Sequence, residues 1–91
     1  MQGFFEENKS KYKQEIGSII KKYRQKANKS ISLISAEIGM TKSMWADLEK
    51  GIKDPQLSTL LRMSQGLNIP ASQIVKDLET NLGQDFTLIE L

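Results

Sequence analysis

The sequence predicts an all-α fold, a compact bundle of five short helices followed by a short C-terminal tail. Three observations lead to this prediction. Apolar residues recur at three- and four-residue intervals along most of the chain, which is the period of a helix. Residues of the kinds that cap, turn or break helices stand between these runs. The 91 residues have the length of one small domain with a modest core.

The first predicted helix spans about residues 13–26, where Ile16, Ile19 and Tyr23 fall at helical spacing. Basic residues crowd its C-terminal end, where cations suit the helix dipole. Residues 1–13 mix aromatic and charged side chains without a clear period. They are therefore expected to be either an N-terminal arm or the start of this helix.

The middle of the chain carries the most specific local pattern. It predicts two short helices, residues 31–38 and 42–50, joined by a tight turn at Gly39, where a left-handed backbone costs glycine little. Ser30 is expected to cap the first of them and Thr41 the second. A short helix, a glycine turn and a second short helix form the helix-turn-helix pattern, which places its second helix in the DNA major groove.

A fourth helix is predicted to run from Asp54-Pro55 to about Gly66. The pair reads as a capping residue followed by a proline in the first helical position. The side chains expected to face the core from this helix are Leu57, Leu60, Leu61 and Met63.

Residues 72–82 predict a fifth helix that Gly83 ends, so the helical domain spans residues 14–82. The tail, residues 83–91, alternates apolar and other residues at first and could form a strand. In a two-fold dimer such a tail could serve as a dimerisation segment that pairs with its mate. The alternatives are a tail that folds onto its own domain or one that is disordered.

The composition excludes several classes of function. The chain has no cysteine and no histidine, so it lacks thiolate metal ligands, imidazole metal ligands and the usual general base. We therefore expect no enzyme activity, no metal and no cofactor. No apolar run reaches the roughly 18 residues of a membrane span, and the first residues do not resemble a signal peptide. We expect a cytoplasmic protein without a membrane partner.

Charge is divided unevenly along the chain. Residues 9–53 contain eleven Lys or Arg and four Asp or Glu, whereas the remainder contains two basic and seven acidic residues. The basic part holds the helix-turn-helix pattern, and a basic patch is the electrostatic footprint of a phosphate-binding surface. The alternative is that these lysine-rich helix faces are simply solvated.

One set of residues has a specific order and spacing between about residues 14 and 78. Its members are Ile16, Arg24, Ile34, Gly39, Trp45, Leu48, Glu49, Gly51, Pro55, Leu57, Leu60 and Leu67. In this set the chain resembles the Xre-type family of bacterial and phage regulators, also called the Cro and lambda-repressor-like family. The resemblance implies a lambda-repressor-like bundle of five helices that binds double-stranded DNA as a homodimer on a palindromic operator.

The resemblance also implies which residues read the DNA bases. The positions that match base-facing positions of the family are Lys42, Ser43, Ala46 and Asp47. Lys42 suits the two acceptors of guanine, Ala46 could touch a thymine methyl, and Asp47 could accept a hydrogen bond from cytosine. Trp45 matches a position that family members bury, so we expect it in the core and not stacked on a base.

Other residues are expected to position the protein on the DNA. Phosphate contacts are expected from Ser30, Thr41, Lys50 and Lys53. Family members often pair the positions of Arg24 and Glu49 in a partly buried salt bridge, which here would fix the second helix of the motif.

Three positions depart from the family pattern: Ser35 replaces an alanine, Ile31 a frequent glutamine, and Asp47 a polar or basic residue. Two functions therefore stay open. The first is a DNA-binding transcriptional regulator, specifically a repressor. The second is an antitoxin-type or other protein-interaction module of the same fold with weak or no DNA binding. Its partner would be a protein such as a toxin, bound by the apolar tail.

Overall fold

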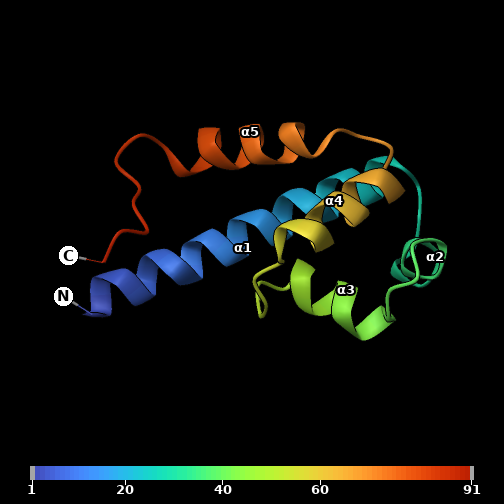
Figure 1. Ribbon diagram of the computed structural model, residues 1–91, viewed down its shortest axis with the longest axis horizontal. Coiled ribbons are helices and arrows are strands. Elements are labelled where there is room, and N and C mark those ends of the chain that lie inside the picture. The colour runs from blue at the N-terminus through green and yellow to red at the C-terminus, as the bar shows by residue number, and fades with distance from the viewer. Residues whose placement is uncertain (1, 91) are drawn as a thin grey trace.

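The computed structural model describes residues 2–90, with side chains from residue 5 onward. It contains α1 (Gln2–Lys26), α2 (Ile31–Glu37), α3 (Lys42–Glu49), α4 (Leu57–Gly66) and α5 (Ala71–Leu82). Figure 1 shows α1 along the whole molecule, with α5 above it, α3 below it and α2 at the end away from the N-terminus. The prediction of an all-α fold is confirmed. None of the described helices is long and apolar enough to cross a membrane.

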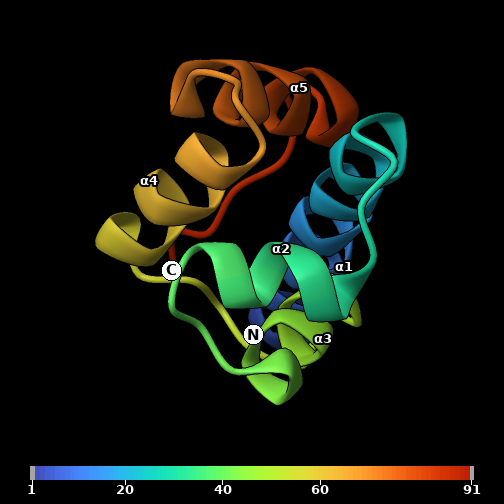
Figure 2. The ribbon, with the colours of Figure 1, turned by 90° about the vertical axis from the view of Figure 1, so that its right-hand side faces the viewer.

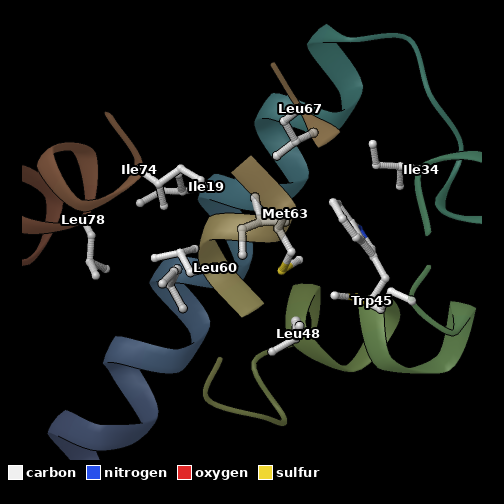
Figure 3. Packing of buried hydrophobic residues seen from close by; sticks show 12 residues of the cluster. Ile19, Ile34, Trp45, Leu48, Leu60, Met63, Leu67, Ile74 and Leu78 are labelled. Carbon is white, nitrogen blue, oxygen red and sulfur yellow. The ribbon is translucent and has the colours of Figure 1, made fainter. Parts of the chain in front are cut away.

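One hydrophobic core joins all five helices. It contains twelve buried apolar side chains among the described residues, including three isoleucines of α1 and the whole indole of Trp45. In Figure 3 the indole lies between Ile34 of α2 and Met63 of α4. Trp45 is 0% exposed, so the expectation that it belongs to the core is confirmed.

The first helix is longer than its apolar pattern suggests. It begins at Gln2, so residues 2–13 are the start of α1 and not a separate arm. The described part of the tail returns along this segment, as Figure 1 shows. Asn8 Nδ2 donates to the carbonyl oxygen of Thr87 over 2.9 Å, and Lys11 Nζ lies 6.0 Å from the centre of the Phe86 ring.

The tail does not form a strand between residues 83 and 90. The suggestion of a strand is therefore wrong for the part of the tail that the structure describes. A turn closed by the Phe86 N–H and the Gly83 carbonyl directs the chain back to α1. There the tail meets a helix side, whose backbone groups are already paired and cannot complete a strand ladder. The alternative of a tail folded onto its own domain is the one observed.

The start of α4 also differs from the prediction. The helix begins at Leu57 with Gln56 as its N-cap, so Asp54 and Pro55 precede it and do not start it. The physical reason is a competing contact. The Tyr12 hydroxyl of α1 donates to Asp54 Oδ1 over 2.5 Å, so this carboxylate serves the packing of the α3–α4 loop (residues 50–56).

Two of the four leucine and methionine positions expected in the core of α4 are exposed. Leu60 and Met63 are buried, whereas Leu57 is 69% and Leu61 46% exposed. Leu57 and Leu61 are four residues apart and share one side of the helix, beside the side that meets the core. The four positions cannot all face inward, so the core expectation is wrong for Leu57 and Leu61.

A close crossing of α1 and α3 fixes the relative position of these two helices. A Cβ atom at Gly17 would lie 2.5 Å from the backbone oxygens of both Leu48 and Glu49. This is closer than non-bonded carbon and oxygen atoms approach, so only glycine permits the crossing. The residue lies inside a helix, where sequence alone gives no reason for a glycine.

Replacement of Gly17 by alanine is expected to lower the free energy of unfolding. The added methyl group must push backbone apart, and overpacking of this kind costs about 1–3 kcal/mol. Urea unfolding of Gly17→Ala measures the change, with Ser18→Ala, at the exposed neighbouring position of α1, as the matched control. Equal midpoints for the two variants would contradict the close crossing.

Candidate nucleic-acid interface

Two capped helices and a glycine turn build the central motif. Ser30 Oγ accepts the N–H of Leu33 and Thr41 Oγ1 accepts the N–H of Met44, each over 3.1 Å. Gly39, between the helices, has a φ of +68°, in the left-handed region that favours glycine. Figure 2 looks onto α2, with α3 below it. The predicted caps and turn are confirmed, and they give the motif its helix-turn-helix geometry.

The third helix has one face in the core and one face in solvent. Trp45 and Leu48 point inward and are at most 2% exposed. The outward positions are Lys42, Ser43, Ala46, Asp47 and Lys50. At 100° per residue these five positions fall within an arc of about 140° around the helix. The structure therefore brings all four candidate base-contacting residues to one outer face of α3.

The carboxylate of Asp47 has a cationic neighbour at the edge of this face. Lys53 Nζ, from the α3–α4 loop, lies 3.8 Å from Asp47 Oδ2, and the two side chains are 54% and 32% exposed. A pair this exposed adds little stability. Its relevance is electrostatic, because the ammonium group offsets part of the repulsion between this carboxylate and an approaching phosphate.

The four candidate phosphate-contacting residues are all exposed: Ser30, Thr41, Lys50 and Lys53. The two hydroxyl oxygens accept backbone N–H groups within the protein, so each hydroxyl hydrogen remains able to donate outward. Lys50 is the C-cap of α3 and Lys53 follows three residues later. Ser30 thus stands at the start of α2 and Thr41 at the start of α3, while Lys50 and Lys53 follow α3.

A network around Glu49 holds α3 against α1. Arg24 Nε donates to Glu49 Oε2 over 2.5 Å, and a second guanidinium nitrogen donates to Oε1 over 3.0 Å. The two side chains are only 13% and 6% exposed. Hydrogen bonding to the carboxylate raises the pKa of the Arg24 guanidinium. The structure thus brings Arg24 and Glu49 together in a bidentate, largely buried pair.

Two further bonds extend this network, and sequence reasoning did not identify either. Trp45 Nε1 donates to Glu49 Oε2 over 2.6 Å, and a third nitrogen of Arg24 donates to the carbonyl of Lys29 over 3.0 Å. The first bond joins residues four apart on one helix, a spacing that could have indicated it. The second ties the connection between α1 and α2 to the same guanidinium. The network therefore spans α1, the start of the motif and α3.

The structure accommodates Ser35 and Ile31, two of the positions that depart from the family pattern. Ser35 is 2% exposed, and its hydroxyl donates to the carbonyl of Ile31 over 2.6 Å, so no polar atom is left unpaired at the contact of α2 with the core. Ile31 is partly buried and packs against the core. Its side chain therefore offers no polar group to a phosphate.

The candidate interface offers groups that could contact both the phosphates and the base edges of a nucleic acid. They are the ammonium groups of lysines, the hydroxyls of Ser43 and of two helix caps, one methyl group and one carboxylate. No group of three or more His, Cys, Asp or Glu side chains within residues 2–90 is placed to hold a metal ion.

Removal of the Arg24 guanidinium is expected to lower the melting temperature. Arg24→Ala leaves a buried carboxylate without its charged partner, which costs about 3 kcal/mol, or more than about 10 °C for a domain of this size. Thermal unfolding followed by circular dichroism measures it. The control is Lys22→Ala, whose partner Asp77 lies 3.5 Å away in an exposed pair. An Arg24→Ala melting temperature equal to that of the wild type would contradict the role of the network.

Comparison with known proteins agrees with this geometry. The family model described as helix-turn-helix matches residues 20–74. HTH-type transcriptional regulator SutR of Escherichia coli (strain K12) is 28% identical over 60 residues, which are 66% of this chain and 34% of the relative. The chain thus spans about a third of the length of that relative. From the extent of the family match, the chain belongs to the Xre/Cro-like helix-turn-helix family.

Proposed function

We propose that this protein is a transcriptional regulator that binds double-stranded DNA in a sequence-specific manner through α3. The observation that carries the proposal is the division of this helix into two faces. Trp45, Leu48 and the Glu49 network fix its inner side, while its outer side presents a narrow arc of polar and small residues. Membership of the helix-turn-helix family and the similarity to a transcriptional regulator support the proposal.

In this proposal, the outer face of α3 reads base edges in the major groove. The Lys42 ammonium donates to the acceptors of a guanine, and the Ala46 methyl meets a thymine methyl. Asp47 accepts a hydrogen bond from the amino group of a cytosine, and Lys53 beside it limits repulsion from the backbone. Ser43, on the same arc, completes the set of base-contacting residues.

Phosphate contacts set the position of α3 in the groove. The hydroxyls of Ser30 and Thr41 donate to phosphates near the starts of the two motif helices, and Lys50 and Lys53 contact phosphates beyond α3. Contacts of this kind carry affinity that weakens with salt, and they do not read sequence.

We further propose that the protein acts as a homodimer on a palindromic operator and represses by covering a promoter. One copy of α3 reads one half-site, and a two-fold pair reads two half-sites about 34 Å apart. Exposed apolar side chains beside the motif support a dimer contact there, because Ile52 is 59% and Leu57 is 69% exposed.

An antitoxin-type or other protein-interaction module is the second candidate function. The observation that favours it is the exposure of two apolar side chains of the tail, Leu88 at 42% and Ile89 at 71%. A toxin or other protein could cover them. Such a module would have weak or no DNA binding.

Selection from random duplexes separates the two candidate functions. The purified protein is expected to enrich a motif with two-fold symmetry and to retain it against an excess of unrelated DNA. Binding of the enriched duplex is expected to weaken steeply with salt. Failure to enrich any sequence, even at low salt, would contradict the regulator and favour the protein-interaction module.

Two lysine variants are expected to weaken DNA binding in different ways. Lys42→Ala should cost about 1–3 kcal/mol on the enriched duplex and relax preference at one base pair, because it removes a base contact. Lys50→Ala should weaken binding to all duplexes alike and reduce the magnitude of the slope of log K against log salt by about one. Fluorescence anisotropy measures both, with Lys76→Ala on α5 as the control. Binding by Lys42→Ala equal to the control would contradict the base-contact assignment.

A further inference from the structure

We infer that the N-terminal half of α1 carries a second phosphate-contacting surface, formed by Lys9 and Lys13 and called here the α1 lysine pair. The inference rests on the proposed function, because it adds a part to the same DNA interface. Both lysines precede residues 20–74, the segment that the family model matches. The family match therefore does not include the residues of this surface.

The direction of Lys13 follows from its two neighbours, which both touch the α3–α4 loop. The Tyr12 hydroxyl donates to Asp54 over 2.5 Å. A Cβ atom at Gly51 would lie 2.9 Å from the Cα of Gln14. Successive helical residues are about 100° apart, so Lys13 projects midway between these two contacts, toward the loop. Its partly buried side chain agrees with a stem that lies along the loop and a head that reaches solvent.

Lys9 lies one turn earlier on the same side of α1, about 6 Å farther toward the N-terminus. Its side chain is exposed. The α3–α4 loop itself carries Lys50 and Lys53, the proposed phosphate contacts after α3. Asp47 and Asp54 also lie at this loop, where they contact Lys53 and Tyr12. With the α1 lysine pair added to Lys50 and Lys53, lysines outnumber carboxylates from the end of α3 across the loop to α1.

The basic residues of α1 differ in whether their charged groups already contact a carboxylate or an aromatic ring of the protein. Lys11, on the tail side of the helix, lies over the Phe86 ring, and Lys22 pairs with Asp77 of α5. Within residues 2–90, neither member of the α1 lysine pair forms an ion pair with a carboxylate of the protein. Their charge is thus available to an external anion.

The shape of the molecule places this surface beside the proposed DNA. Figure 1 shows the α3–α4 loop between α3 and the N-terminal half of α1. A duplex that receives α3 in its major groove continues past the α3–α4 loop toward the N-terminal half of α1. Its phosphates form a closely spaced row of negative charges, which suits ammonium groups about 6 Å apart along a helix.

The salt dependence of binding tests the inference. The variant Lys9→Gln/Lys13→Gln and the wild type are titrated into the enriched duplex at several salt concentrations. The slope of log K against log salt is negative, and each lost phosphate contact reduces its magnitude by about 0.9. Loss of both contacts is therefore expected to reduce the magnitude by about two. Base preference is expected to be unchanged, and Lys9→Arg/Lys13→Arg is expected to keep the wild-type slope.

The matched control is Lys11→Gln/Lys76→Gln, which removes the same charge from the tail side of α1 and from α5. It is expected to leave the slope close to that of the wild type. Equal slopes for the control and the Lys9→Gln/Lys13→Gln variant, with both melting as folded proteins, would overturn the inference.

Failure of the proposed function gives a different result. If the wild type prefers no sequence, the regulator proposal fails. The same titrations on unrelated duplexes still test the α1 lysine pair, because phosphate contacts do not depend on sequence. In that case a fall in slope confined to Lys9→Gln/Lys13→Gln supports the pair, and the absence of this fall overturns it.

Discussion

The position of α3 depends on one carboxylate. Glu49 accepts hydrogen bonds from Arg24 of α1 and from the indole of Trp45, while the same guanidinium reaches the carbonyl of Lys29 before α2. Burial of a charged group is costly unless its atoms are bonded, and both oxygens of this carboxylate have partners. Neither α3 nor the entry to α2 can shift against α1 without breaking a charge-assisted bond.

Close backbone packing acts together with this network. Gly17 lets α1 touch the end of α3, and Gly51 lets the α3–α4 loop turn against Gln14. The outer face of α3 and the lysines of the loop are thus carried on one rigid frame with α1. This frame matters for DNA recognition because base contacts depend on side chains that are already in place when the duplex arrives.

Local signals made part of this fold predictable, and non-local contacts account for what was missed. The caps and the left-handed turn at Gly39 depend on neighbouring residues, so sequence predicted them correctly. Asp54 has the residue type of a helix cap but bonds Tyr12, 42 residues away, and α4 starts later. The reason for Gly17 is likewise a contact with a distant helix. The outer face of α3 followed from helical period and resemblance. The bond of Trp45 to Glu49 is also local, and its four-residue spacing on one helix could have indicated it.

The central claim is that the outer face of α3 is the surface that contacts DNA, and that the hydrogen bonds of Glu49 hold this helix in position. The most direct test is an NMR titration of the protein with the enriched duplex, followed through backbone amides and the Trp45 indole N–H. The account predicts the largest shifts in the first turn of α3 and from Lys50 to Lys53, with the indole signal nearly unmoved because it stays bonded to Glu49. Largest shifts on α5 and the tail, with the amides of α3 unchanged, would contradict it.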